Sequence, residues 1–146
     1  MHNVTKKVAL CTGSGSAIGI GANILRHLSS QGYRVVVSDL GEHSSPESSG
    51  KSTEAMQSVA ASITSIGGEC IVIPCDVREP KQVKHLFDQV ISSYGQIDVL
   101  INNAGIGYLM RAFLDVPIDE WKMVLDVNLT GTFLCTQEAI RHMIKA

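Results

Sequence analysis

Four short, almost wholly apolar runs divide the chain at intervals, and each ends in turn residues. They are rich in Val, Ile, Leu and Cys, and they occupy residues 8–11, 34–39, 70–74 and 98–102. A strand without polar alternation is buried on both faces, as happens when helices cover both sides of a parallel sheet. The chain is therefore predicted to be an α/β protein with a parallel sheet of about four strands.

Stretches with helical periodicity lie between these runs. Apolar residues recur three or four positions apart in 20–28, 56–66 and 83–91, and a glycine follows each stretch, as is typical of helix ends. Residues 118–145 are also predicted to be helical, with an interruption or bend near 128–131. Right-handed crossovers place such helices on both faces, so we expect a doubly wound sheet in a single domain, residues 1–146.

Composition disfavours several classes of function. The 146 residues carry a formal net charge of -2, whereas nucleic-acid-binding proteins usually have a basic excess. No segment approaches the ~20 continuous apolar residues of a membrane span. The four cysteines form no Cys-x-x-Cys pair and have no His at a metal-ligand spacing. We therefore expect no nucleic acid, membrane or metal as a partner, and free, mostly buried thiols in a cytoplasmic protein.

A glycine-rich segment, residues 12–21, separates the first predicted strand from the first predicted helix. A pyrophosphate needs backbone N–H groups pointing at it and no side chains in the way, and a glycine loop at a helix N-terminus meets both needs. Glycines also form plain tight turns, but the position between a strand and a helix favours dinucleotide binding. The candidate phosphate-binding residues are Gly13, Gly15, Ser16, Gly19, Ile20 and Gly21.

Asp39 stands at the end of the second apolar run. A carboxylate there can accept hydrogen bonds from both hydroxyls of the adenosine ribose, each worth ~1.5–3 kcal/mol in a shielded site. The same carboxylate would repel a 2′-phosphate, and the loop contains no Arg or Lys to offset that repulsion. NAD is therefore favoured over NADP. The alternative interpretation is that Asp39 simply ends a strand at a turn.

Gly15, Gly19 and Gly21 resemble the G-x-x-x-G-x-G pattern of the short-chain dehydrogenase/reductase family. Relative to that pattern, the loop carries two extra residues, because Thr12-Gly13 already ends the strand. The resemblance implies a Rossmann-type fold, a nicotinamide dinucleotide as cofactor, and hydride transfer between the nicotinamide and a small alcohol or ketone substrate.

Two further motifs extend the resemblance. Asp76 and Val77 follow the third run, where the family uses an Asp and the next backbone N–H against adenine. Asn103, Ala104 and Gly105 belong to a segment similar to the family's N-N-A-G motif, in which small residues let the backbone lie against the cofactor. The resemblance therefore implies that all five residues bind the cofactor.

The family's catalytic residues are matched only in part. Asn128 resembles the helix Asn of the family's catalytic tetrad, whose backbone carbonyl holds a water in a proton relay; the alternative is an ordinary polar residue at a helix kink. The family's catalytic Ser and Tyr-x-x-x-Lys lie after a fifth strand, and none of Tyr33, Tyr94 and Tyr108 has a Lys four residues later. The resemblance implies that this chain supplies the cofactor-binding part of an NAD(P)-dependent oxidoreductase, is truncated relative to the family, and is inactive alone.

Two surfaces suggest other roles. In the resembled fold the fourth strand pairs with a fifth, so without that strand residues 99–101 are expected to form an apolar edge that favours pairing with another chain. The resemblance also implies a subunit interface on the 118–145 helix, so we expect a homo-oligomer. The alternative function is a non-catalytic nucleotide-binding or oligomerisation module. The polar loop at 41–52 has two open interpretations: it covers the adenosine end, or it is a projecting tip without a role.

Overall fold

The computed structural model describes residues 6–107 and 110–145, so Tyr108 lies outside the described residues. One sheet contains four parallel strands, which are β1 Val8–Cys11, β2 Arg34–Val37, β3 Cys70–Val72 and β4 Val99–Ile101. The strand order is β3-β2-β1-β4. The chain therefore extends from β1 in one direction through β2 and β3, and then crosses back to place β4 on the other side of β1. The predicted parallel sheet is confirmed.

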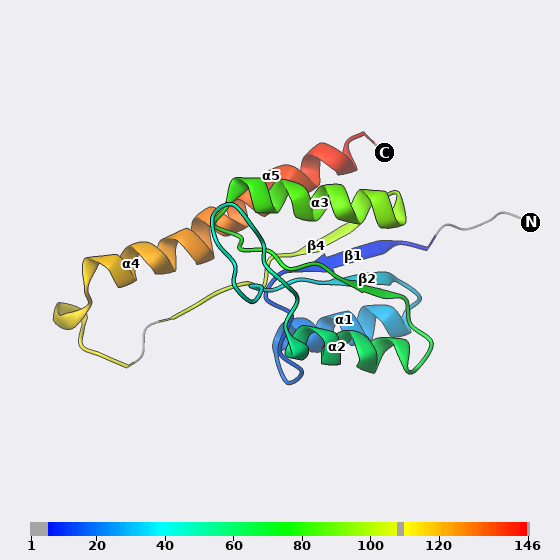
Figure 1. Ribbon diagram of the computed structural model, residues 1–146, viewed down its shortest axis with the longest axis horizontal. Coiled ribbons are helices and arrows are strands. Elements are labelled where there is room, and N and C mark those ends of the chain that lie inside the picture. The colour runs from blue at the N-terminus through cyan, green and yellow to red at the C-terminus, as the bar shows by residue number, and fades with distance from the viewer. Residues whose placement is uncertain (1–5, 108–109, 146) are drawn as a thin grey trace, which may run out of the picture.

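Helices cover both faces of this sheet (Figure 1). One face carries α1 (Ile20–Ser30) and α2 (Glu54–Thr64), and the other carries α3 (Pro80–Tyr94) and α5 (Gly131–Met143). Consecutive side chains of β1 enter opposite cores: those of Val8 and Leu10 pack with α3 and α5, and those of Ala9 and Cys11 with α1 and α2. The doubly wound arrangement thus explains why the strand sequences lack polar alternation.

The four thiols are free, as predicted. Cys11, Cys75 and Cys135 are buried and Cys70 is half-buried. Burial, with a smaller contribution from the charge of Asp39, raises the pKa of Cys11 to about 12, and burial raises that of Cys135 to about 12. These thiols are protonated at neutral pH and serve as small apolar side chains.

The C-terminal part forms one long helical rod (Figure 1). It consists of α4 (Ile118–Leu125), a π-helical segment η2 (Asp126–Thr130) and α5. The irregularity predicted near 128–131 is therefore present, but as a wider turn within a continuous helix and not as a break. Figure 1 shows α4 extending beyond the sheet, and none of its side chains is buried.

Two unpaired surfaces follow from this arrangement. Among the described residues β4 pairs only with β1, so its outer edge is open, as predicted. The rod exposes several large apolar side chains, which are Ile118, Trp121, Met123, Leu125, Leu129, Phe133 and Ile140. None of the helices in 6–107 and 110–145 has the length and hydropathy needed for a membrane span.

Candidate functional site

A cavity of about 450 Å³ opens at the carboxyl ends of the strands. It forms where the chain direction reverses across the sheet, because the segments that follow β1 and β4 diverge there towards opposite faces. Its lining residues are Thr12, Gly13, Ser38, Asp39, Leu40, Cys75, Asp76, Val77, Arg78, Asn103, Ala104, Gly105, Ile106, Met123 and Val127. The volume lies within the ~300–1,000 Å³ typical of small-molecule sites.

The structure brings together seven of the predicted site residues in this cavity, which are Gly13, Asp39, Asp76, Val77, Asn103, Ala104 and Gly105. The remaining predicted residues are not part of its lining: Gly15, Ser16, Gly19, Ile20, Gly21 and Asn128. Most of these belong to the connection between β1 and α1 or to the start of α1, so they lie beyond Gly13 at the same end of the sheet.

The Asp39 carboxylate is held by two backbone N–H groups. The Gly15 N–H donates to Oδ2 and the Leu40 N–H to Oδ1, both at 2.8 Å. A Cβ on Gly15 would lie 2.9 Å from both the Asp39 Cβ and its Oδ2, so only glycine lets the loop approach this closely. The carboxylate lines the cavity in a fixed orientation and retains lone pairs for further donors.

Helix α1 begins at Ile20, so the connection from β1 comprises residues 12–19. Gly19 is the N-cap, and within the described part of the chain no side chain caps this end. The first-turn N–H groups and the helix dipole are therefore available to an anion.

Gly21 lies inside the first turn of α1 and not in the loop, which corrects the predicted extent of the glycine segment. A Cβ on Gly21 would lie 2.7 Å from the Asn103 Nδ2 and 3.0 Å from Ser14. Its missing side chain thus allows α1 to pack closely against the loop and the end of β4.

Thr12, which the sequence analysis did not select, ties the ends of β1 and β4 together. Its Oγ1 accepts hydrogen bonds from the N–H groups of Asn103 (3.2 Å) and Ala104 (3.1 Å). In return, the Asn103 side-chain amide donates to the carbonyls of Thr12 (3.1 Å) and Gly13 (2.8 Å). A hydroxyl residue directly before the turn glycine was the only signal in the sequence.

Replacing Thr12 with valine keeps the side-chain shape but removes both acceptor contacts. The Ala104 N–H loses its hydrogen bond, whereas the Asn103 N–H keeps the Ile101 carbonyl at 3.1 Å. We therefore expect the free energy of unfolding to fall by about 1–3 kcal/mol. Urea denaturation measures this. Thr12→Ser retains the hydroxyl and should lose less than half as much. Equal losses in the two variants would show that the methyl group matters and the hydrogen bonds do not.

Arg78 is a second residue that the sequence analysis missed. Its Nε lies 2.9 Å from Asp76 Oδ1, and its Nη2 lies 2.6 Å from Oδ2. Burial opposes ionisation of Asp76, but the hydrogen bonds and charge of Arg78 outweigh it and lower the pKa of that carboxyl. Arg78 Nη1 also contacts the Met123 Sδ, which links this ion pair to α4. The cavity therefore contains a cation, although the loop after β1 contributes none.

Comparison with known proteins identifies the family to which this fold and cavity belong. The family model described as short chain dehydrogenase matches residues 7–146. The chain belongs to the short chain dehydrogenase family.

Individual relatives agree with this assignment. The 3-oxoacyl-[acyl-carrier-protein] reductase of Synechocystis sp. is 34% identical over 145 residues, which are 99% of this chain and 53% of that protein. Glucose 1-dehydrogenase 2 of Bacillus subtilis is 31% identical over 143 residues, with coverages of 98% and 51%. The crystal structure of a short-chain type dehydrogenase/reductase from Mycobacterium marinum superposes with a TM-score of 0.83 at 35% identity, covering 95% of this chain and 51% of that one. The chain spans about half the length of the relatives it matches.

Two features of this chain fit a dinucleotide. The uncapped start of α1 suits a phosphate, and the fixed carboxylate of Asp39 suits two hydroxyls. In addition, the Ser38 hydroxyl is buried at the cavity and has no hydrogen-bond partner within the described residues. A buried polar atom without a partner is unfavourable, so a polar ligand in this cavity could satisfy it.

Asn128 lies in η2 and fixes the segment after β4. Its side chain exchanges two hydrogen bonds of 2.8 Å with the backbone of Ile106. Its backbone carbonyl accepts the Thr132 hydroxyl at 2.9 Å. Asn128 therefore connects the helical rod to the cavity wall at Ile106, and the relay role suggested by the resemblance stays a prediction.

Proposed function

We propose that this chain is the cofactor-binding part of an NAD(P)-dependent oxidoreductase that transfers hydride between a nicotinamide and an alcohol or carbonyl carbon. The observation that carries the proposal is the fixed Asp39 carboxylate beside the uncapped start of α1, at the switch point of a doubly wound sheet. The names of the relatives, a reductase and a dehydrogenase, support the same reaction type.

Each part of the dinucleotide has a matching set of residues. The loop at 13–19 and the start of α1 would hold the pyrophosphate. Asp39 would accept both hydroxyls of the adenosine ribose, which favours NAD over NADP. Asp76 and the Val77 N–H would contact the adenine, and the backbone at 103–105 would lie along the part of the cofactor that leads to the nicotinamide. We assign these roles to one domain formed by residues 1–146.

When bound, the nicotinamide supplies or accepts the hydride; the proton must be moved by a side chain. No described tyrosine lines the cavity. Tyr94 belongs to α3, and its ring packs against the guanidinium of Arg34 from β2. Burial raises the pKa of Tyr94 to about 12. The 146-residue chain contains no Tyr followed by Lys at the fourth position. We therefore propose that it binds the cofactor but has no measurable dehydrogenase activity by itself.

Calorimetric titration of the chain with NAD, ADP-ribose and NADP tests this proposal. Because the assigned contacts lie on the adenosine and pyrophosphate side, NAD and ADP-ribose should bind with similar affinity, and NADP more weakly. NAD binding much tighter than ADP-ribose would reveal a complete nicotinamide site. Absence of binding by all three would overturn the proposal.

The second candidate is a non-catalytic module that pairs through its open surfaces. The unpaired edge of β4 and the exposed apolar side chains of the rod favour it. Size-exclusion chromatography with circular dichroism separates the two. A folded, discrete homo-oligomer would support the module, whereas aggregated or molten material would support a cofactor-binding part that needs further chain. For both candidates, the free thiols lead us to predict a cytoplasmic location.

A further inference from the structure

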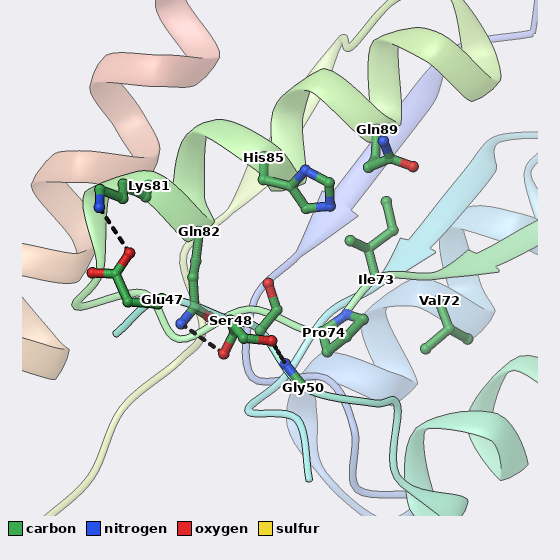
Figure 2. Close-up of a pocket in the computed structure, with 11 residues that line it drawn as sticks. Glu47, Ser48, Gly50, Val72, Ile73, Pro74, Lys81, Gln82, His85 and Gln89 are labelled. Atoms are coloured by element: carbon green, nitrogen blue, oxygen red, sulfur yellow. Dashed lines mark hydrogen bonds and ion pairs between the residues drawn. The ribbon is translucent and has the colours of Figure 1, made fainter. Parts of the chain in front are cut away.

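Gln82 is a polar side chain buried at the start of α3, with only 3% of its surface exposed. All of its hydrogen bonds are to backbone groups. Its Oε1 accepts the Asp76 N–H at 2.8 Å, and its Nε2 donates to the carbonyls of Ser45 (2.6 Å) and Ser48 (3.2 Å). Figure 2 shows the side chain reaching from α3 to the loop.

These contacts define where the loop at 41–52 lies. The loop is closed on itself by antiparallel bridges between Glu42 and Lys51 and between Ser45 and Ser48. It also reaches α3 through an ion pair of Glu47 with Lys81 at 2.9 Å (Figure 2). None of its residues from 42 onwards lines the cavity at Asp39. The loop is therefore not a free tip, because it is held against α3, and its residues from 42 onwards do not contribute to the lining of the cavity at Asp39.

The loop instead lies next to Asp76 and Arg78. A second cavity, of about 400 Å³, is lined by loop residues 44–46 together with Asp76, Arg78 and Glu79. The Asp76–Arg78 ion pair thus lines both cavities, one shared with the residues around Asp39 and the other with the loop. Gln82 is the side chain that is hydrogen-bonded to both, because it holds the Asp76 N–H on one side and the two loop carbonyls on the other.

We propose that Gln82 is a positioning residue for the adenine base: it orients Asp76 and Val77 towards the cofactor and ties that orientation to the loop that follows Asp39. The inference rests on the proposed function, because it assigns the adenine to Asp76. The physical reason is geometric. The direction of the Asp76 carboxylate and of the Val77 N–H depends on the backbone at Asp76, and the Gln82 Oε1 fixes that backbone from a helix.

A selectivity ratio separates positioning from general stability. Adenine offers an amino group to the Asp76 carboxylate and a ring nitrogen to the Val77 N–H, whereas hypoxanthine presents a carbonyl and a ring N–H at those places. We expect the chain to bind NAD at least about tenfold more tightly than nicotinamide hypoxanthine dinucleotide, which corresponds to about one hydrogen bond to a charged group. A variant that is only less stable weakens both ligands equally and leaves this ratio unchanged.

Gln82→Met removes all three hydrogen bonds at similar side-chain length. We expect the ratio of its affinities for NAD and nicotinamide hypoxanthine dinucleotide to fall towards one. Amide hydrogen exchange at Asp76 and in residues 42–51 should become faster. Gln89→Met is the matched control, because Gln89 lies two turns along the same helix and is exposed. It should change neither the ratio nor the exchange.

Gln82→Glu separates the contact with the Asp76 N–H from the contacts with the loop carbonyls. A carboxylate keeps an acceptor for the Asp76 N–H but cannot donate to the Ser45 and Ser48 carbonyls. We expect faster exchange in the loop with a ratio near that of the unmodified chain. If Gln82→Met does not fold, Gln82→Glu provides the test. Loss of the preference for NAD over nicotinamide hypoxanthine dinucleotide in Gln82→Glu would overturn the proposal.

A folded Gln82→Met variant with an unchanged ratio would also overturn the proposal and leave the proposed function intact. If the unmodified chain binds neither dinucleotide, the proposed function fails and this inference fails with it. The two failures are distinguished by the first titration, before any variant is examined.

Discussion

Asp39→Ala is expected to weaken NAD binding at least about 100-fold. The variant removes two charge-assisted hydrogen bonds to the ribose, each worth ~1.5–3 kcal/mol, and every 1.4 kcal/mol is tenfold in affinity. The orientation of the carboxylate makes the loss large, because the N–H groups of Gly15 and Leu40 hold it in place before any ligand binds. Isothermal titration calorimetry with NAD measures the effect.

NADP binding provides the internal test of this explanation. Without the carboxylate, repulsion of the 2′-phosphate disappears and Arg78 is left as a cation lining the same cavity. The affinity for NADP should therefore stay constant or rise, and the preference for NAD should be lost. Asp88→Ala is the control, since Asp88 is an exposed carboxylate on α3 whose ion pair with Lys84 contributes little. Equal weakening of NAD and NADP in Asp39→Ala would instead indicate a loop that has lost its structure.

Gly13→Ala is expected to unfold the chain or come close to it. Gly13 has a φ of 62°, which is unfavourable for any residue with a Cβ, and that Cβ would lie 2.6 Å from the Ala104 Cα and 2.9 Å from the Ala104 N. Backbone atoms cannot rotate away as a side chain can. Left-handed strain of ~1–3 kcal/mol and overpacking of ~1–3 kcal/mol together approach the ~5–15 kcal/mol that stabilises a typical domain. Urea denaturation followed by circular dichroism measures the loss.

Gly32→Ala is the matched control for this variant. Gly32 has a φ of 89°, but no atom lies within 4 Å of the position its Cβ would take. Gly32→Ala therefore has the backbone strain without the steric clash. We expect it to lower the free energy of unfolding clearly less than Gly13→Ala does. Similar urea midpoints for the two variants would show that the contact between Gly13 and Ala104 is not tight.

The strands and helices could be predicted because their signals are local. The apolar runs form strands whose side chains enter cores on both faces, fully buried in β1 and partly buried in the edge strands β3 and β4, and the amphipathic stretches pack on the sheet. Gly95 follows the end of α3, as predicted for a glycine after this stretch, and Pro80 occupies the first turn, where its missing N–H costs no hydrogen bond. Helix α1 begins at Ile20, where the predicted helical periodicity also begins, so the glycine segment predicted at 12–21 overlaps the helix by its last two residues.

The residues that complete the site could not be predicted, because their partners are distant in sequence. Thr12 bonds to the backbone at 103–104, Arg78 contacts Met123, and Gln82 bonds to the loop carbonyls of Ser45 and Ser48. In the local sequence, each of these three residues is an ordinary polar residue. They reach their partners only because the fold places β4 beside β1 and α3 beside the loop.

The sequence by itself determined the kind of sheet, its helical layers and the positions of the glycines and of Asp39, since periodicity and residue type act over a few neighbouring positions. The tertiary structure decided which polar groups meet: the bonds that fix Asp39, the ion pair at Asp76, and the hydrogen bonds that hold the loop against α3. Hydrogen bonds depend on tenths of an ångström and on direction, and those quantities exist only once distant segments have packed together.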